Sequence, residues 1–197
     1  ELIGYTGATG SRLPHLHLEL RDGRQRPLNP LTHGFKLSMD TVPIIEKIAL
    51  RPLSPAAAID GYREPRVLTP GEEGTKEPIP VWGRFGVEAA AIEKLAGNRL
   101  GIFSIELLMD GRRVFRRTYD RFSYQNYRWA PLVFDRYLDR IRHRDLQRLY
   151  RRRDDEIIFA QDVASSSGIL QTVNPDLPGY AAPGKHRLKI RAVSASG

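Results

Sequence analysis

The stretch Gly101-Ile102-Phe103-Ser104-Ile105-Glu106-Leu107-Leu108-Met109 runs into Asp110-Gly111, and Arg113 to Tyr119 follows directly. Asp-Gly between two such runs is a strong hairpin signal, because the turn positions need backbone conformations that these residues adopt readily. The stretch therefore predicts two antiparallel strands joined by a tight turn. It favours a fold that is built mainly from β-strands.

Further short strands are expected on both sides of this hairpin, at residues 44–50, 66–68, 79–83, 85–92, 156–160, 168–173 and 185–193. The stretch from Pro131 to Tyr150 interrupts them, because Phe134, Leu138 and Ile141 keep helical spacing and the spacing resumes at residues 146–150. Many short strands with turn signals and one short helical insert predict an immunoglobulin-like β-sandwich over residues 43–197.

The composition limits the chemistry that the chain can carry. It has 197 residues, 41% of them hydrophobic, and no cysteine. Any zinc must therefore be held by His, Asp or Glu. No apolar run approaches the roughly 20 residues that a membrane span needs, so no transmembrane segment is expected.

Positive charge is concentrated in one segment of the chain. The net charge is +8, and residues 112–153 contain 14 arginines, no lysine and four aspartates. A basic surface favours a polyanionic partner such as nucleic acid, anionic lipid or an acidic wall polymer. The preferred interpretation is a solvated helix face, because Asp139 and Asp145 interrupt the run at helical spacing. No nucleic-acid-binding motif is recognisable, so nucleic acid is not expected as a partner.

The stretch Pro14-His15-Leu16-His17-Leu18-Glu19-Leu20 alternates polar and apolar residues, which indicates a half-buried strand. His15, His17 and Glu19 would then share one face, and the leucines would bury the other. One imidazole could hold Zn²⁺ while the other acts on a proton or stabilises negative charge beside it. Taken alone, the pair fits two exposed surface histidines equally well.

The flanking residues add a family resemblance. Ile3-Gly4-Tyr5-Thr6-Gly7-Ala8-Thr9-Gly10, the His15–His17 strand and Pro27-Leu28-Asn29-Pro30-Leu31 together resemble the end of the lysostaphin-type (LytM-like, duplicated hybrid motif) zinc endopeptidase domain. The resemblance implies that residues 1–42 are the C-terminal part of an antiparallel β metallopeptidase domain. It implies that His17 is a zinc ligand, that His15 is the catalytic histidine, and that Glu19 is structural.

The order of segments after residue 42 resembles members of this family that carry a β-sandwich behind the peptidase domain. The resemblance implies a hydrolase, a metalloendopeptidase that cuts peptide cross-links of the bacterial cell wall, with peptidoglycan peptides as its substrate. It also implies an exported protein of the cell envelope. The sandwich is then expected to position substrate or to attach the protein within the envelope.

Two features depart from the family pattern. The loop Ser11-Arg12-Leu13-Pro14 is shorter than usual and lacks the glycine. The His-x-x-x-Asp motif that supplies further zinc ligands does not occur, and His33, His143 and His186 are not spaced to replace it. A catalytic zinc needs three protein ligands, so the zinc site is incomplete and this chain alone is expected to bind zinc weakly and to cleave nothing.

The peptidase domain is expected to begin upstream of Glu1, where the other ligands and any signal peptide would lie. The alternative is a catalytically inactive relative that acts as a binding or regulatory module in the envelope.

Overall fold

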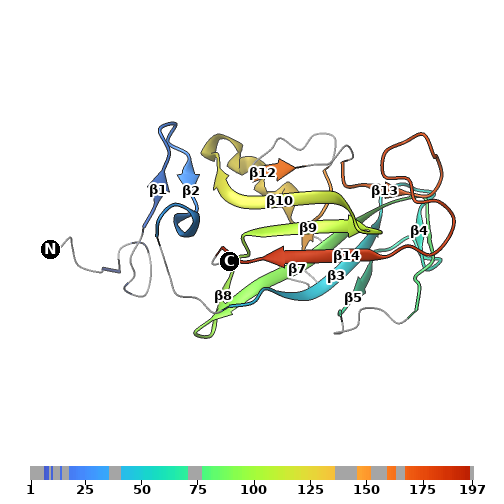
Figure 1. Ribbon diagram of the computed structural model, residues 1–197, viewed down its shortest axis with the longest axis horizontal. Helices are drawn as coiled ribbons and strands as arrows, with labels where there is room; N and C mark the ends of the chain where they lie inside the picture. The colour runs from blue at the N-terminus through green and yellow to red at the C-terminus, as the bar shows by residue number, and fades with distance from the viewer. Residues whose placement is uncertain are drawn as a thin grey trace.

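The computed structural model describes residues 7–8, 10, 14, 18–35, 41–70, 77–135, 146–151, 159–162 and 167–195. Within these ranges the chain is mainly β, with antiparallel sheets and only short helical turns (Figure 1). The mainly β class predicted from the hairpin and its flanking runs is confirmed. The immunoglobulin-like strand arrangement and the boundary between residues 42 and 43 stay predictions.

The first sheet has the order β1-β2-β10-β9-β14, and β12 also pairs with β10. Its strands are β1 (Leu20–Arg21), β2 (Pro27–Leu28), β9 (Ser104–Met109), β10 (Arg112–Phe122), β12 (Phe159–Asp162) and β14 (Leu188–Val193).

The second sheet has the order β11-β7-β3-β5, and β8 and β13 also pair with β7. Its strands are β3 (Ile44–Pro52), β5 (Arg66–Leu68), β7 (Arg84–Leu95), β8 (Asn98–Leu100), β11 (Gln147–Arg148) and β13 (Leu170–Gln171). A separate pair joins β4 (Ala58–Ile59) to β6 (Val81–Trp82).

The two sheets share one apolar core, so they pack face to face as a sandwich. Alternation along the strands turns every second side chain inward. The core cluster takes buried residues from β3, β7, β9 and β10: Leu50, Phe85, Val87, Ala89, Ala91, Ile105, Leu107, Val114 and Phe115. Partly buried residues of β14 pack against the same cluster.

The hairpin predicted around Asp110-Gly111 is confirmed. β9 and β10 pair from Met109 opposite Arg112 to Ser104 opposite Thr118. Asp110 and Gly111 have φ values of 51° and 81°, which is the left-handed geometry that this short turn requires. The hairpin then supplies the two central strands of the first sheet.

The structure describes only part of the predicted helical insert. A 3₁₀ helix η2 (Tyr124–Trp129) leads into a single helical turn, α1 (Ala130–Val133), and residues 136–145, which include His143, lie outside the described residues. The helix predicted over residues 146–150 is wrong, because Gln147 and Arg148 form β11 and pair with Ala89 and Glu88 of β7. A short strand beside a bend buries residues at the same spacing as a helix.

The first part of the Arg-rich segment lies on a strand, β10, as the hairpin predicts, and the residues around Asp139 and Asp145, for which a solvated helix face is expected, lie outside the described residues. Five of its arginines lie in β10. Arg117 is only 1% exposed, its Nη1 donates to the Arg148 carbonyl at 2.9 Å, and its guanidinium lies 5.0 Å from the centroid of the Phe115 ring. Part of the positive charge is therefore internal to the fold.

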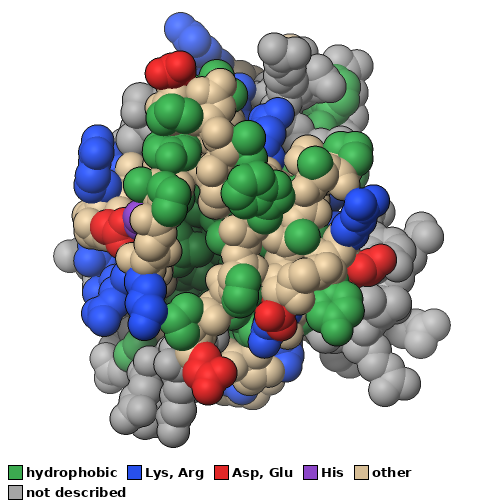
Figure 2. Space-filling model, turned by 90° about the vertical axis from the view of Figure 1, so that its right-hand side faces the viewer, with side chains coloured by type: hydrophobic (Ala, Val, Ile, Leu, Met, Phe, Trp, Pro, Cys, Tyr) green, Lys and Arg blue, Asp and Glu red, His purple; other side chains and the backbone are tan. Residues whose placement is uncertain are grey.

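Hydrophobic side chains gather on the end of the molecule that faces the viewer in Figure 2. The residues exposed near β4, β6 and the segment after β13 are Tyr62, Trp82, Val173 and Leu177. The β1–β2 hairpin lies at the opposite end (Figure 1). Among the described residues, no helix combines the length and apolarity required to cross a bilayer.

Candidate functional site

The two histidines that the sequence singles out, His15 and His17, lie outside the described residues. The structure describes what flanks them: Pro14 on one side and Leu18 onward on the other. Leu18 is 47% exposed, so the burial expected for the leucine face is not found at this residue. Its position explains the exposure, because the β1–β2 pairing extends only from Leu20 to Arg21 and Leu18 lies beyond it.

Glu19 ties the segment after the histidines to η2. Its Oε2 accepts a hydrogen bond from the Tyr124 hydroxyl at 2.7 Å, and its Oε1 pairs with Arg21 Nε. The same hydrogen bond raises the pKa of Tyr124, because it stabilises the protonated phenol beside a carboxylate. The Arg21 guanidinium lies 5.6 Å from the centroid of the Tyr124 ring. These contacts connect Glu19 to η2 and to its own strand.

The turn of the β1–β2 hairpin is organised by Asp22. Its Oδ1 accepts from the backbone N–H groups of Arg24 and Arg26, both at 2.9 Å, and its Oδ2 accepts from Arg26 Nε at 2.7 Å. These hydrogen bonds, the Arg26 side chain first, lower the pKa of Asp22 to about 2. Asp22 therefore anchors this turn.

Asn29, in the Asn-Pro-Leu part of the family-like sequence, joins the hairpin to the sandwich. Its Oδ1 accepts from the Leu31 N–H at 3.1 Å, which caps the 3₁₀ helix η1 (Pro30–Thr32). Its backbone N–H donates to the Asp120 carbonyl at 2.6 Å, and its Nδ2 donates to the Tyr119 carbonyl at 3.3 Å. A single asparagine therefore caps the helix and fastens the segment to β10.

η1 makes a second attachment to the same strand. Thr32 Oγ1 donates to Asp120 Oδ1 at 2.8 Å. His33 lies in the following turn and is exposed, with Nδ1 3.2 Å from Thr32 Oγ1 and 3.8 Å from Asp120 Oδ1. His33 is therefore an exposed turn residue beside this attachment.

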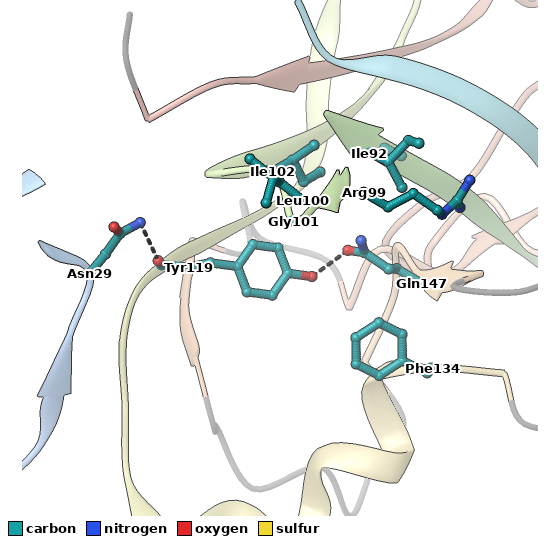
Figure 3. Close-up of a pocket in the computed structure, with 10 residues that line it drawn as sticks. Asn29, Ile92, Arg99, Leu100, Gly101, Ile102, Tyr119, Phe134 and Gln147 are labelled. Atoms are coloured by element: carbon teal, nitrogen blue, oxygen red, sulfur yellow. Dashed lines mark hydrogen bonds between the residues drawn. The ribbon is translucent and has the colours of Figure 1, made fainter. Parts of the chain in front are cut away.

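A cavity of about 490 Å³ lies beside this attachment. Its walls come from Asn29, the β7–β8 region, β10, Phe134 and β11 (Figure 3). The Tyr119 hydroxyl donates to Gln147 Oε1 within it, and burial raises the pKa of Tyr119. Ile92, Leu100 and Ile102 supply its apolar surface.

The lining of this cavity carries no unbalanced charge among the described residues. The Arg99 guanidinium at its edge bonds both oxygens of Glu46, at 2.9 and 2.8 Å, so its charge is balanced. Among the described residues that line the cavity, no nucleophile lies beside a base. Sequence reasoning missed it because its walls come from distant segments. Alternation in β10 does predict the inward direction of Tyr119, two residues after the buried Arg117.

His186 is exposed and has two hydrogen-bond partners. Its Nδ1 lies 2.6 Å from Asp110 Oδ2 and its Nε2 lies 2.7 Å from the Ala182 carbonyl. The Asp110 carboxylate raises the pKa of His186, and the pKa of Asp110 is lowered by the Arg187 N–H and by His186. Within the described part of the chain, no three His, Asp or Glu side chains converge as a metal site.

Comparison of the chain with known protein families, curated proteins and solved structures found no match.

Proposed function

We propose that this chain is the C-terminal part of a cell-wall zinc metalloendopeptidase, followed by an accessory, immunoglobulin-like β-sandwich. One observation carries the proposal: the Gly-rich turns, the Pro14–Leu20 strand pattern and Asn29-Pro30-Leu31 follow one another in the order typical of the lysostaphin-type family. The capping role of Asn29 supports it, because it gives a physical reason for an asparagine before Pro-Leu at this point.

His17 would be a zinc ligand, and His15 would hold or transfer a proton beside it. Zinc supplies Lewis-acid polarisation of a peptide carbonyl. The described residues offer no cluster that completes the ligand set, and one histidine is too few for a catalytic site. The other ligands would come from the region upstream of Glu1. The substrate would be the short peptides that cross-link peptidoglycan in the envelope.

The sandwich would seat the catalytic strand. Only a short hairpin separates His17 from Asn29, and Asn29 and Thr32 bond directly to β10. Residues that position a catalytic group must be held on rigid elements. The attachment of the following hairpin to β10 through Asn29 and Thr32 would limit how far the segment that carries the histidines can move from the sandwich.

Zinc stoichiometry and peptidoglycan hydrolysis test the proposal. The 197-residue chain is expected to bind zinc weakly and to cleave nothing. In the protein extended upstream to include a His-x-x-x-Asp motif, we expect one tightly bound zinc. His17→Ala should remove that zinc, and His15→Ala should retain it while lowering hydrolysis by about 10²- to 10⁴-fold.

His33→Ala is the matched control, because His33 is an exposed turn histidine in the same segment. It should change neither zinc content nor hydrolysis. One tightly held zinc in the 197-residue chain would contradict the proposal, as would equal effects of His17→Ala and His33→Ala. An extended protein that binds peptidoglycan without zinc or hydrolysis would favour the inactive envelope module instead.

A further inference from the structure

The outermost strand of the first sheet carries a regular row of cations. β14 pairs with β9 and lies at the end of the sheet order. Leu188, Ile190 and Ala192 pack against the core. Alternation therefore turns Lys189 and Arg191 outward, and both are exposed.

The row continues upstream of β14. Lys185 and Arg187 keep the same spacing of every second residue and are also exposed. Asp110 N–H donates to the Arg187 carbonyl at 2.9 Å, and Asp110 Oδ1 accepts from the Arg187 N–H at 2.8 Å. The backbone at Arg187 thus stays alongside the end of β9, as a continuation of the strand.

A second row of cations lies two strands further into the sheet. Arg113 and Lys189 both lie opposite Leu108, and Arg116 and Arg191 both lie opposite Glu106. Neighbouring strands are about 4.8 Å apart, so the two rows are about 10 Å apart. The six cations, which we call the basic sheet face, are Lys185, Arg187, Lys189, Arg191, Arg113 and Arg116. Lys and Arg side chains gather on the matching left-hand margin of Figure 2.

Few carboxylates balance this face. Glu106 lies between the rows, with its carboxylate oxygens 3.6 Å from Arg116 Nε and 3.6 Å from Arg191 Nη1. Asp162 of β12 lies opposite Arg116 in the register. Asp110 is engaged by His186 and by the Arg187 N–H. The face therefore keeps a net positive charge at neutral pH.

Charged residues on an edge strand also prevent unwanted strand pairing. That role accounts for Lys189 and Arg191 on β14. It does not account for Arg113 and Arg116, because β10 is an interior strand of the sheet with partners on both sides. Arg113, whose Nη1 lies 3.8 Å from Glu106 Oε1, shares this one carboxylate with Arg116 and Arg191. The two cation rows therefore retain positive charge that suits an anionic ligand lying along the strands.

The shape of the face selects the kind of anion. Cations at every second strand residue are about 6.8 Å apart, a spacing comparable with the phosphate repeat of an extended glycerol phosphate chain. Arginine binds phosphate through two parallel hydrogen bonds. Leu108 and Thr118, which are partly exposed, lie beside these cations on β9 and β10, and neither offers an aromatic ring on which a nucleobase could stack.

We propose that the basic sheet face binds a linear phosphodiester polymer without nucleobases, of the glycerol phosphate type. The polymer lies along β14 and β10, and successive phosphates meet successive cations. This role goes beyond the proposed peptidase function and requires neither His15, His17 nor zinc. A failed binding test therefore leaves the peptidase proposal standing, and a failed zinc test leaves this one standing.

The test uses fluorescence anisotropy of a labelled synthetic glycerol phosphate oligomer with the 197-residue chain. Lys189→Gln/Arg191→Gln should weaken binding by roughly fivefold or more. It should also reduce the slope of log K against log salt by about 1.4, because each lost contact to a single strand contributes about 0.7. The matched control is Arg63→Gln/Lys94→Gln, which removes two exposed cations outside this face.

Equal losses in the two double variants, or no binding of the oligomer, would overturn the proposal. Tighter binding to oligothymidylate of equal charge or to phosphatidylglycerol vesicles would overturn the choice of polymer. Thermal unfolding checks that the variants fold. If Lys189→Gln/Arg191→Gln does not fold, Lys185→Gln/Arg113→Gln changes both rows and must show the same loss.

Discussion

Gly86 is the residue of β7 over which the Tyr150 ring lies. A Cβ built at Gly86 would lie 2.4 Å from Tyr150 Cε1, much closer than van der Waals contact. The ring cannot move away easily, because its hydroxyl donates to Glu88 Oε1 at 2.9 Å and Tyr150 is buried. Arg51 Nε completes the partners of the Glu88 carboxylate at 2.6 Å. Glycine at position 86 therefore makes this buried polar group possible.

Gly86→Ala should destabilise the fold by about 2 to 3 kcal/mol or more, because overpacking a filled site forces side chains and backbone to shift. Urea unfolding followed by tryptophan fluorescence measures the change in the free energy of unfolding. Gly101→Ala is the control, since a Cβ there meets nothing within 4 Å. It should change the free energy by less than about 0.5 kcal/mol. Equal effects of the two substitutions would contradict this account of Gly86.

At the scale of elements, the β1–β2 hairpin with η1 is attached to the sandwich by few bonds. Among the described residues, β2 pairs with β10 through Arg121 and Leu28. Asn29 and Thr32 bond to the same strand, and Glu19 accepts a hydrogen bond from Tyr124 of η2. An element with so few contacts opens locally at lower free energy than the core. Its attachment should therefore be separable from global stability.

Asn29→Ala removes the cap of η1 and the Nδ2 bond to the Tyr119 carbonyl. We expect a local loss of about 1 kcal/mol, seen as faster hydrogen exchange at the Leu31 and Asn29 amides. Exchange in the β9–β10 hairpin should stay unchanged. Asn29→Asp keeps the capping oxygen and loses only the Nδ2 donor, so it should show a smaller effect at Leu31. Uniformly faster exchange across both sheets would contradict a local role.

Elements with local signals were predictable from the sequence. Asp110-Gly111 fixes its hairpin through the conformations of two adjacent residues, and β7 shows in the sequence as an apolar run. β11 was not predictable, because its strand form depends on pairing with Ala89 and Glu88 of β7. The helical spacing of the residues around it is equally satisfied by a short strand next to a bend.

At the scale of the whole molecule, the sandwich class follows from the number of strands and turns, but the strand order does not. β2 joins β10 across more than 80 residues of sequence, and no local pattern encodes such a pairing. The candidate site likewise has one part that the local sequence predicts and one part that it does not. The His15–His17 pattern is local and could be recognised, whereas the cavity beside Tyr119 assembles from segments that only the completed fold brings together.

The pH dependence of global stability combines several shifted groups. The folded pKa values of Asp22, Glu46 and Asp110 are lowered by their partners. The stability that these carboxylates contribute is present above their unfolded-state pKa values of about 4 and is lost as pH falls through their folded-state pKa values. The folded pKa of His186 is raised from 6.5. The stability that His186 contributes is complete below its unfolded-state pKa and is lost as pH rises through its folded-state pKa.

Stability should therefore be greatest between about pH 4.5 and pH 6.5 and should decline on both sides. Thermal unfolding from about pH 3 to about pH 8.5 measures this profile, and NMR titration gives the pKa of His186 directly.

Asp110→Asn suits the positive φ of 51° at this position, since asparagine tolerates the left-handed region. It also keeps an acceptor for the Arg187 N–H. The variant should lose the decline above pH 6.5 and return the pKa of His186 toward its ordinary value. The His186–Asp110 pair joins the β9–β10 turn to the segment before β14. An unchanged alkaline decline in Asp110→Asn would mean that groups other than this pair cause the loss of stability above pH 6.5.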